Sequence, residues 1–209
     1  MVKLFDDISL TNKGKLLKLL QTHSFTFKSG KTILSTIKDD DIIGIVLEGS
    51  INIVHNSYSG EKFVIERLGK DDVFSTMFLP VISSEYDIVT EEDSKIVIID
   101  YNNIINNSFY HYSYYHKFIG NLLGIIHEKM KEKNERIHIL SQKTIRNKLL
   151  EYFKLKTENR ITKNIYLPYT FTELASYLGT DRSAMYRELK HLQNEGLIEI
   201  KNKKIVLKY

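Results

Sequence analysis

The segment from Thr170 to Ile200, TFTELASYLGTDRSAMYRELKHLQNEGLIEI, constrains the fold of this chain more than any other. Its apolar residues have helical spacing in two runs separated by Gly179, and Thr180 and Asp181 supply side-chain oxygens that can cap the second run. The residues expected to face inward are Leu174, Ala175 and Leu178 in the first run and Met185, Leu189 and Leu192 in the second. The pattern predicts two short helices joined by a tight turn.

The second predicted helix presents a cationic, hydrogen-bonding face, made of Arg182, Ser183, Tyr186, Arg187 and Lys190. A short, capped helix with such a face is suited to the major groove of DNA, because arginine forks pair with the edges of guanine. A basic helix face is also commonly no more than solvated surface, and glycine-separated helices occur in many α-helical proteins. The helix pair alone therefore leaves both interpretations open.

The residues after this helix favour the DNA-binding interpretation. Gly196 ends the helix, and Leu197 to Ile200 then alternates as a strand. Lys201 to Lys204 forms a polar turn, and Ile205 to Leu207 returns as a second strand. Two helices followed by a hairpin indicate a winged helix-turn-helix with a cationic wing tip.

This region resembles the Crp/Fnr family of bacterial transcription regulators, and its clostridial-type branch most closely. The resemblance is carried by Glu173-Leu174-Ala175, Gly179, Asp181 to Met185, Arg187-Glu188-Leu189 and Glu195 to Ile198. It implies that Arg182, Ser183 and Arg187 contact base edges, and the bulky Tyr186 is a fourth candidate, for a thymine methyl or a phosphate. Many members carry glutamate where this chain has Ser183, so the family's usual half-site is not transferred. The alternative for the two arginines is a surface ion pair with Glu173 or Glu188.

A second group of residues is expected to contact DNA phosphates, which positions a protein without distinguishing sequences. Its members are Thr172, Thr180, Lys190, Lys201, Lys203 and Lys204. For each lysine singly, solvated surface is an equal alternative. The charge distribution agrees with a basic module attached to another domain: residues 141–209 hold 14 Lys and Arg against 7 Asp and Glu, whereas residues 1–140 hold 16 against 19.

The N-terminal half has the pattern of an antiparallel β-roll. After a predicted short helix at residues 9–22, short strands alternate with glycine turns. The expected strands are Phe25–Phe27, Lys31–Leu34, Ile42–Leu47, Ser50–His55, Lys62–Arg67, Asp72–Phe74, Tyr86–Thr90 and Lys95–Ile99. Two glycine-containing segments, Ile45 to Ile51 around Gly49 and Gly69 to Phe74, resemble the sensor domain of the same family. This resemblance implies a double-stranded β-helix of the jelly-roll type.

A long helix is predicted from Ile119 to Leu140, with apolar residues near heptad spacing and an interruption at Lys133. The resemblance implies that it is a dimerisation helix, with Ile119, Leu122, Ile126, Met130 and Ile137 at the interface. A hinge is expected near Leu140–Lys143, then a helix to Lys156 and a polar loop over residues 157–168. The predicted class is α+β, with a sensor domain at 1–110, a linker and dimerisation helix at 111–140, and a winged helix-turn-helix at 141–209.

The segment Phe74 to Asp87 departs from the cyclic-nucleotide binders of the family. It has no arginine to pair with a cyclic phosphate and no Gly-Glu pair, so cyclic AMP is not expected. What remains is an apolar pocket or, as the alternative, an ordinary core. The candidate pocket residues are Phe74, Met77, Phe78, Leu79, Tyr86, Leu122, Leu123 and Ile126.

Other functions have weaker support. The chain has no cysteine, which excludes cysteine-ligated iron–sulfur clusters, and its histidines lack the paired spacing of metal sites, so no cofactor or metal is expected; haem through His116 or His127 is a minor alternative. No catalytic motif is found.

A cupin-like binding protein or enzyme and a protein-binding adaptor are the other classes considered. The sequence favours a cytoplasmic homodimeric regulator on a pseudo-palindromic DNA site, with an unknown effector, RNA polymerase as a further candidate partner, and no membrane association.

Overall fold

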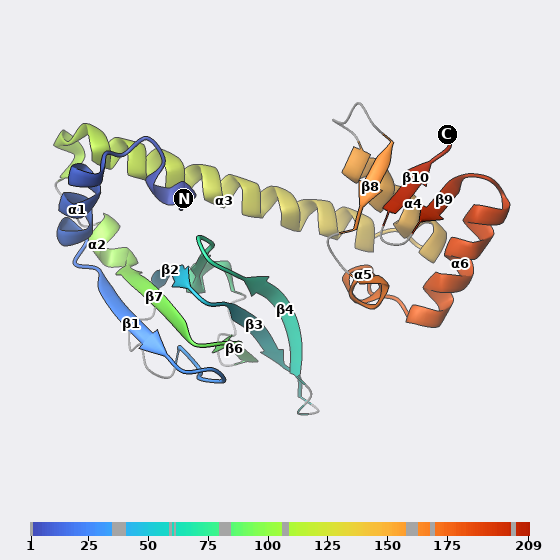
Figure 1. Ribbon diagram of the computed structural model, residues 1–209, viewed down its shortest axis with the longest axis horizontal. Helices are drawn as coiled ribbons and strands as arrows, with labels where there is room; N and C mark the ends of the chain where they lie inside the picture. The colour runs from blue at the N-terminus through green and yellow to red at the C-terminus, as the bar shows by residue number, and fades with distance from the viewer. Residues whose placement is uncertain are drawn as a thin grey trace. The chain divides into compact units, whose positions relative to one another are not determined.

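The computed structural model describes residues 2–34, 41–58, 60, 62–79, 85–105, 109–157, 163–167, 170–201 and 204–209, and the account that follows concerns these residues. The chain divides into two compact units, Met1–Ile125 and Ile126–Tyr209 (Figure 1). The sequence predicted three parts, residues 1–110, 111–140 and 141–209. Ile139, near the end of the long helix, is buried in the core of the C-terminal unit.

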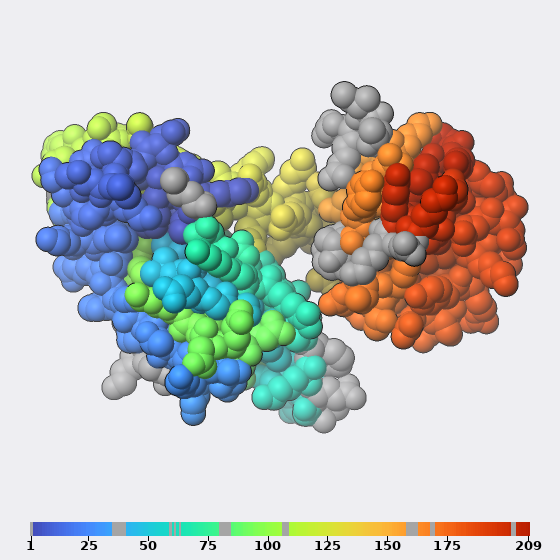
Figure 2. Space-filling model, viewed as in Figure 1, coloured from blue at the N-terminus to red at the C-terminus, as the bar shows by residue number. Residues whose placement is uncertain are grey.

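The N-terminal unit is a roll of two antiparallel sheets, with strand orders β1-β7-β2-β5 and β4-β3-β6. The strands are β1 His23–Phe27, β2 Ile42–Glu48, β3 Ile51–Asn56, β4 Lys62–Leu68, β5 Val73–Ser75, β6 Tyr86–Thr90 and β7 Ser94–Asp100. The helices are η1 Lys3–Phe5, α1 Leu10–Leu19, η2 Thr76–Phe78, α2 Tyr101–Ile105 and η4 Phe109–His111. Side chains fill the space that the ribbon view shows between the sheets (Figure 2). The predicted β-roll is confirmed.

One predicted strand, Lys31–Leu34, is wrong. Thr32 forms only an isolated bridge with Val89. The backbone amide of Lys31 donates to the hydroxyl of Thr90, so it is not available for a regular ladder of backbone hydrogen bonds. The segment follows Gly30, whose φ of 75° directs the chain into a turn.

The roll depends on a close approach between Gly44 of β2 and Phe74 of β5, which are paired residues on neighbouring strands. Phe74 is buried, and a Cβ atom built on Gly44 would lie 2.0 Å from Cζ of its ring. The ring therefore occupies the volume that any other residue at position 44 would need. Because that ring belongs to the core between the two sheets, it has little room to move away.

We expect Gly44→Ala to destabilise the N-terminal unit by about 1 to 3 kcal/mol, the usual cost of overpacking a core. Urea unfolding followed by hydrogen exchange of the β2 amides measures this. Gly69→Ala is the matched control, because a Cβ there meets nothing within 4 Å. Equal stability of the two variants would show that Phe74 relaxes without cost.

The C-terminal unit is a winged helix-turn-helix, as predicted. Its elements are α4 Ile145–Thr157, β8 Asn164–Tyr166, α5 Phe171–Tyr177, α6 Arg182–Asn194, β9 Ile198–Lys201 and β10 Lys204–Leu207. The sheet has the order β8-β10-β9. The sequence predicted a polar loop over residues 157–168, and β8 lies within that range. This short strand forms because Ile165 pairs with Ile205 of β10 and is buried in the core.

The long helix α3, Ser113–Leu140, begins earlier than the predicted Ile119. Its first turns form because Tyr115 and Phe118 are buried, and the Tyr115 hydroxyl donates to the carbonyl of Ile104 at 2.7 Å. Within the described part of the chain, no helix is both long enough and apolar enough to cross a bilayer.

Candidate DNA-binding surface

Two capped helices and a tight turn place α6. Thr170 and Glu173 form a reciprocal capping box at the start of α5. Gly179 adopts a φ of 56° in the turn, a conformation that glycine adopts readily. Asp181 caps α6, and its Oδ1 accepts from the backbone amide of Ala184 at 2.9 Å. The N-cap residue is Asp181 and not Thr180, which was predicted to share this role.

Burial of one side of α6 determines which side faces solvent. The predicted inward residues Met185, Leu189 and Leu192 are buried in one core, together with Tyr152 and Phe153 of α4. The predicted base-contacting residues all lie on the exposed side: Arg182, Ser183, Tyr186 and Arg187. The structure therefore brings these four side chains to one accessible face of one helix.

An ion-pair network connects α6 to α4. Arg146 of α4 donates to Glu188 at 3.2 Å and to Oε1 of Glu195 at 2.8 Å, and its second terminal nitrogen pairs with Oε2 of Glu195. Hydrogen bonding to Arg146 lowers the pKa of Glu195 below its usual range. Glu188 is thus occupied by Arg146, and Glu173 by its helix cap. Among the residues described, neither Arg182 nor Arg187 forms an ion pair, so the alternative assigned to these arginines is not observed.

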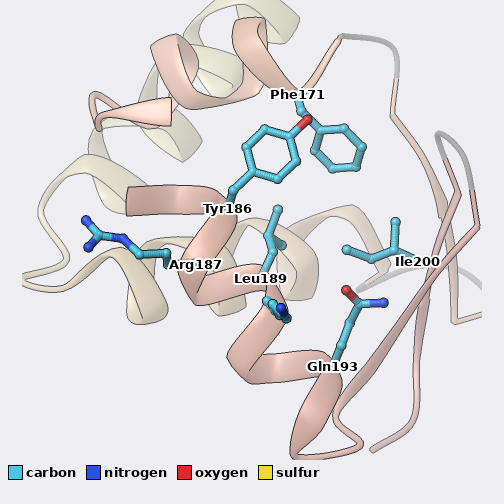
Figure 3. Close-up of a pocket in the computed structure, with 7 residues that line it drawn as sticks. Phe171, Tyr186, Arg187, Leu189, Gln193 and Ile200 are labelled. Atoms are coloured by element: carbon cyan, nitrogen blue, oxygen red, sulfur yellow. The ribbon is translucent and has the colours of Figure 1, made fainter. Parts of the chain in front are cut away.

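An aromatic pair lies beside the exposed face. The Tyr186 ring is 5.4 Å from that of Phe171, and the Arg182 guanidinium is 5.5 Å from the centre of the Tyr186 ring. Figure 3 shows Tyr186 extending towards Phe171, while Arg187 points away from it. A groove of about 460 Å³ adjoins this pair, lined by Phe171, Tyr186, Arg187, Leu189, Lys190, Gln193 and Ile200. Its lining is mainly apolar, with two cationic residues, Arg187 and Lys190.

The phosphate-contact candidates differ in how accessible their charges are. Thr172 and Lys190 are exposed, and Thr180 is half-buried. Lys201 Nζ lies 2.6 Å from Glu199, which also binds Lys208 at 2.8 Å. Lys204 lies over the ring of Tyr166. Lys203 is outside the described residues. Among the described residues of this hairpin and the C-terminal end, Glu199 therefore partly neutralises Lys201 and Lys208.

The predicted pocket residues lie in several environments. Phe74 is in the core of the roll, and Leu79 and Tyr86 pack against that core. Phe78 is half-buried and Met77 is exposed. On α3, Leu122 is buried, Leu123 is exposed and Ile126 belongs to the second unit. The structure thus brings Phe74, Leu79 and Tyr86 together, and the pocket itself remains a prediction.

The exposed side of α3 carries an apolar stripe. Leu123, Met130 and Ile137 are 59%, 59% and 64% exposed and are seven residues apart. Ile119 and Ile126 are half-buried, whereas Leu122, predicted for the dimer interface, is only 6% exposed. The sequence places both Leu122 and Leu123 on the apolar stripe, and the seven-residue spacing of Leu123, Met130 and Ile137 was the signal that could have assigned Leu123 to the predicted interface.

The histidines show no sign of a shared site. Nε2 of His116 contacts the carbonyl of Tyr110, and His127 is exposed on α3. Over the described ranges, no group of three or more His, Cys, Asp or Glu residues could hold a metal ion.

Comparison with known proteins agrees with this architecture. Residues 146–208 match the Crp-like helix-turn-helix domain. Among solved structures, a CooA mutant from Carboxydothermus hydrogenoformans is 18% identical with a TM-score of 0.63, over 100% of this chain and 95% of that chain. The catabolite activator protein of Thermus thermophilus is 18% identical with a TM-score of 0.52, over 99% and 93%. CprK complexed with OCPA is 14% identical with a TM-score of 0.69, over 93% and 91%. No curated protein sequence matches the chain.

The capped helix pair, the hairpin and the exposed basic face define a winged helix-turn-helix protein. Residues 146–208 match the Crp-like helix-turn-helix domain, and the whole chain has the fold of the solved structures of CooA and of the catabolite activator protein. The cupin-like alternative is not favoured.

We expect Glu199→Gln to increase affinity for all DNA sequences alike, because it releases Lys201 and Lys208 to pair with phosphates. Hydrogen bonds from these two lysines lower the pKa of Glu199 from 4.5 to about 2. The carboxylate is therefore charged at neutral pH, and the stability that the ion pairs contribute is lost only as the pH falls below about 4.5 and through about 2. Binding titrations at roughly 50 and 200 mM salt should show a steeper salt dependence, by about one phosphate contact or more.

Glu91→Gln is the control for the change in net charge, because Glu91 is an exposed carboxylate of the N-terminal unit. If both variants shift affinity equally, overall charge rather than release of the wing lysines is responsible.

Proposed function

We propose that this Crp/Fnr-type regulator binds double-stranded DNA sequence-specifically as a homodimer in the cytoplasm and controls transcription there. The observation that carries the proposal is the exposed face of α6, where Arg182, Ser183, Tyr186 and Arg187 are held outward by a buried opposite side. A helix of this kind can enter the major groove with its N-terminal residues against base edges. The proposal includes contact with RNA polymerase and no catalytic step.

The homodimer is supported by the exposed stripe on α3. Leu123, Met130 and Ile137 repeat every seven residues, the spacing of a left-handed pair of helices. A second copy of the same helix would cover the stripe with an identical, self-complementary stripe. Two symmetry-related α6 helices then require a pseudo-palindromic site, with half-site centres about 34 Å apart or a multiple of that distance.

We propose that any effector is not a cyclic nucleotide and that no resident cofactor is needed. Between Phe74 and Asp87 the sequence has no arginine to pair with a cyclic phosphate. The contact of His116 with the Tyr110 carbonyl likewise leaves that nitrogen poorly placed to ligate haem. An effector bound to the N-terminal unit would act by binding one of two conformations more tightly than the other.

Arg182→Ala should abolish discrimination between a selected DNA site and a scrambled one. A bidentate arginine–guanine contact contributes about 1 to 3 kcal/mol of discrimination, and a dimer would make it twice. Lys190→Ala should instead weaken binding to both sequences, because a phosphate contact is independent of sequence. The same holds for Lys203→Ala. Electrophoretic mobility-shift titrations on both DNAs measure the two effects. Unchanged preference for the selected site in Arg182→Ala would refute the assignment of α6 as the base-contacting helix.

Met130→Lys should disrupt the homodimer, because it places a charge in the centre of the exposed α3 stripe. Glu132→Lys introduces the same side chain at an exposed position about 200° away around the helix, and it should leave the dimer intact. Sedimentation velocity of both variants measures whether each is a monomer or a dimer. Loss of the dimer in both, or in neither, would argue against this interface.

A further inference from the structure

A hydrogen bond at the start of α6 determines what Ser183 can offer to a base. The Ser183 hydroxyl donates to Oδ1 of Asp181 at 2.6 Å. The same oxygen accepts from the backbone amide of Ala184, so Asp181 both caps the helix and holds the serine side chain. Ser183 is itself exposed, on the face that carries Arg182.

The direction of this hydrogen bond follows from the charge of Asp181. Its pKa is lowered, first by the Ser183 hydroxyl and then by the Ala184 amide, so the carboxylate is ionised at neutral pH and can only accept. A serine hydroxyl has one hydrogen and two lone-pair sites. Since the hydrogen is engaged by Asp181, the exposed Oγ of Ser183 is left with acceptor capacity alone.

The major groove offers few donors to such an acceptor. Cytosine presents the N4 amino group and adenine the N6 amino group, whereas guanine O6 and N7 and thymine O4 are acceptors. We propose that Ser183 is a specificity-determining residue that selects a base carrying an exocyclic amine, cytosine or adenine, and disfavours guanine and thymine at the same position. This inference rests on the proposed DNA-binding function and names the class of base that one residue of that site recognises.

The neighbouring residue has the opposite character. Arg182 is a donor only, and its guanidinium lies over the ring of Tyr186. Two adjacent side chains of α6 therefore offer fixed and opposite hydrogen-bonding types. A site bound by this helix is expected to pair a guanine, opposite Arg182, with a nearby amine-bearing base, opposite Ser183.

The test is in-vitro selection of DNA sites by the purified full-length protein, followed by affinity measurements on every single-base substitution of the selected site. We expect one pair of symmetry-related positions to prefer cytosine or adenine by about fivefold, the effect of a single hydrogen bond. Ser183→Ala should remove the preference at this pair alone. Asp181→Asn should keep it, because an amide oxygen also accepts and asparagine is an equally good cap.

Asp181→Gly is the decisive variant. Glycine retains most of the capping stability, at a cost of a few tenths of a kcal/mol, but removes the acceptor that holds the Ser183 hydroxyl. The hydroxyl can then rotate and donate, so guanine and thymine should become acceptable at the same positions. Far-UV circular dichroism checks that α6 is intact.

The outcomes separate this inference from the proposed function. Selection of a symmetric site whose profile is unchanged in Ser183→Ala or Asp181→Gly, or which has guanine or thymine at the Ser183-dependent positions, overturns the inference and leaves DNA binding standing. Enrichment of no symmetric site at all overturns the proposed function, and the inference with it.

Discussion

Burial of one side of α6 is the constraint on which the DNA-binding surface depends. Met185, Leu189 and Leu192 lie in the same core as Tyr152 and Phe153 of α4. Each apolar side chain stabilises that position by about 1.5 to 3 kcal/mol when fully buried. Because a helix has a fixed period, burial of these residues leaves the other side of α6 facing solvent. Arg146 of α4 adds a second connection, since it pairs with Glu188 of α6 and with Glu195, the residue that follows the last turn of α6.

The exposed face is organised by local contacts rather than left as free side chains. Asp181 holds the Ser183 hydroxyl, and Tyr186, packed against Phe171, lies beneath the Arg182 guanidinium. Ordering these groups in the free protein would lower the entropic cost of the proposed DNA binding. At the wing, in contrast, Glu199 occupies Lys201 and Lys208. Among the described residues, the cationic side chains of α6, where bases would be distinguished in the proposed complex, are therefore less neutralised than Lys201 and Lys208.

The helix α3 shows how two neighbouring residues can have different roles. Leu122 is buried within the N-terminal unit, and Leu123 is exposed on the stripe that contains Met130 and Ile137. Successive residues of a helix are about 100° apart, so one side can pack against its own domain while another remains free for a partner. A list of apolar residues does not separate these two sides. Their separation follows from which side of α3 packs against the N-terminal segment and α2, where Phe5 stacks on Phe118 and the Tyr115 hydroxyl donates to the Ile104 carbonyl.

The sequence alone determined the elements that depend on neighbours in the chain. The helical spacing around Met185, the capping residue Asp181 and the turn glycine Gly179 predicted the helix-turn-helix, and alternating strands with glycine turns predicted the roll. Only the tertiary structure decided that β8 forms, that Leu122 is buried, and that Glu199 neutralises wing lysines. The first two depend on residues distant in the sequence, and the third on how side chains of β9 and the C-terminal end meet. The periodicity of a sequence shows which side of a helix or strand is apolar. Packing in three dimensions decides which element covers that side and which atom accepts each hydrogen bond.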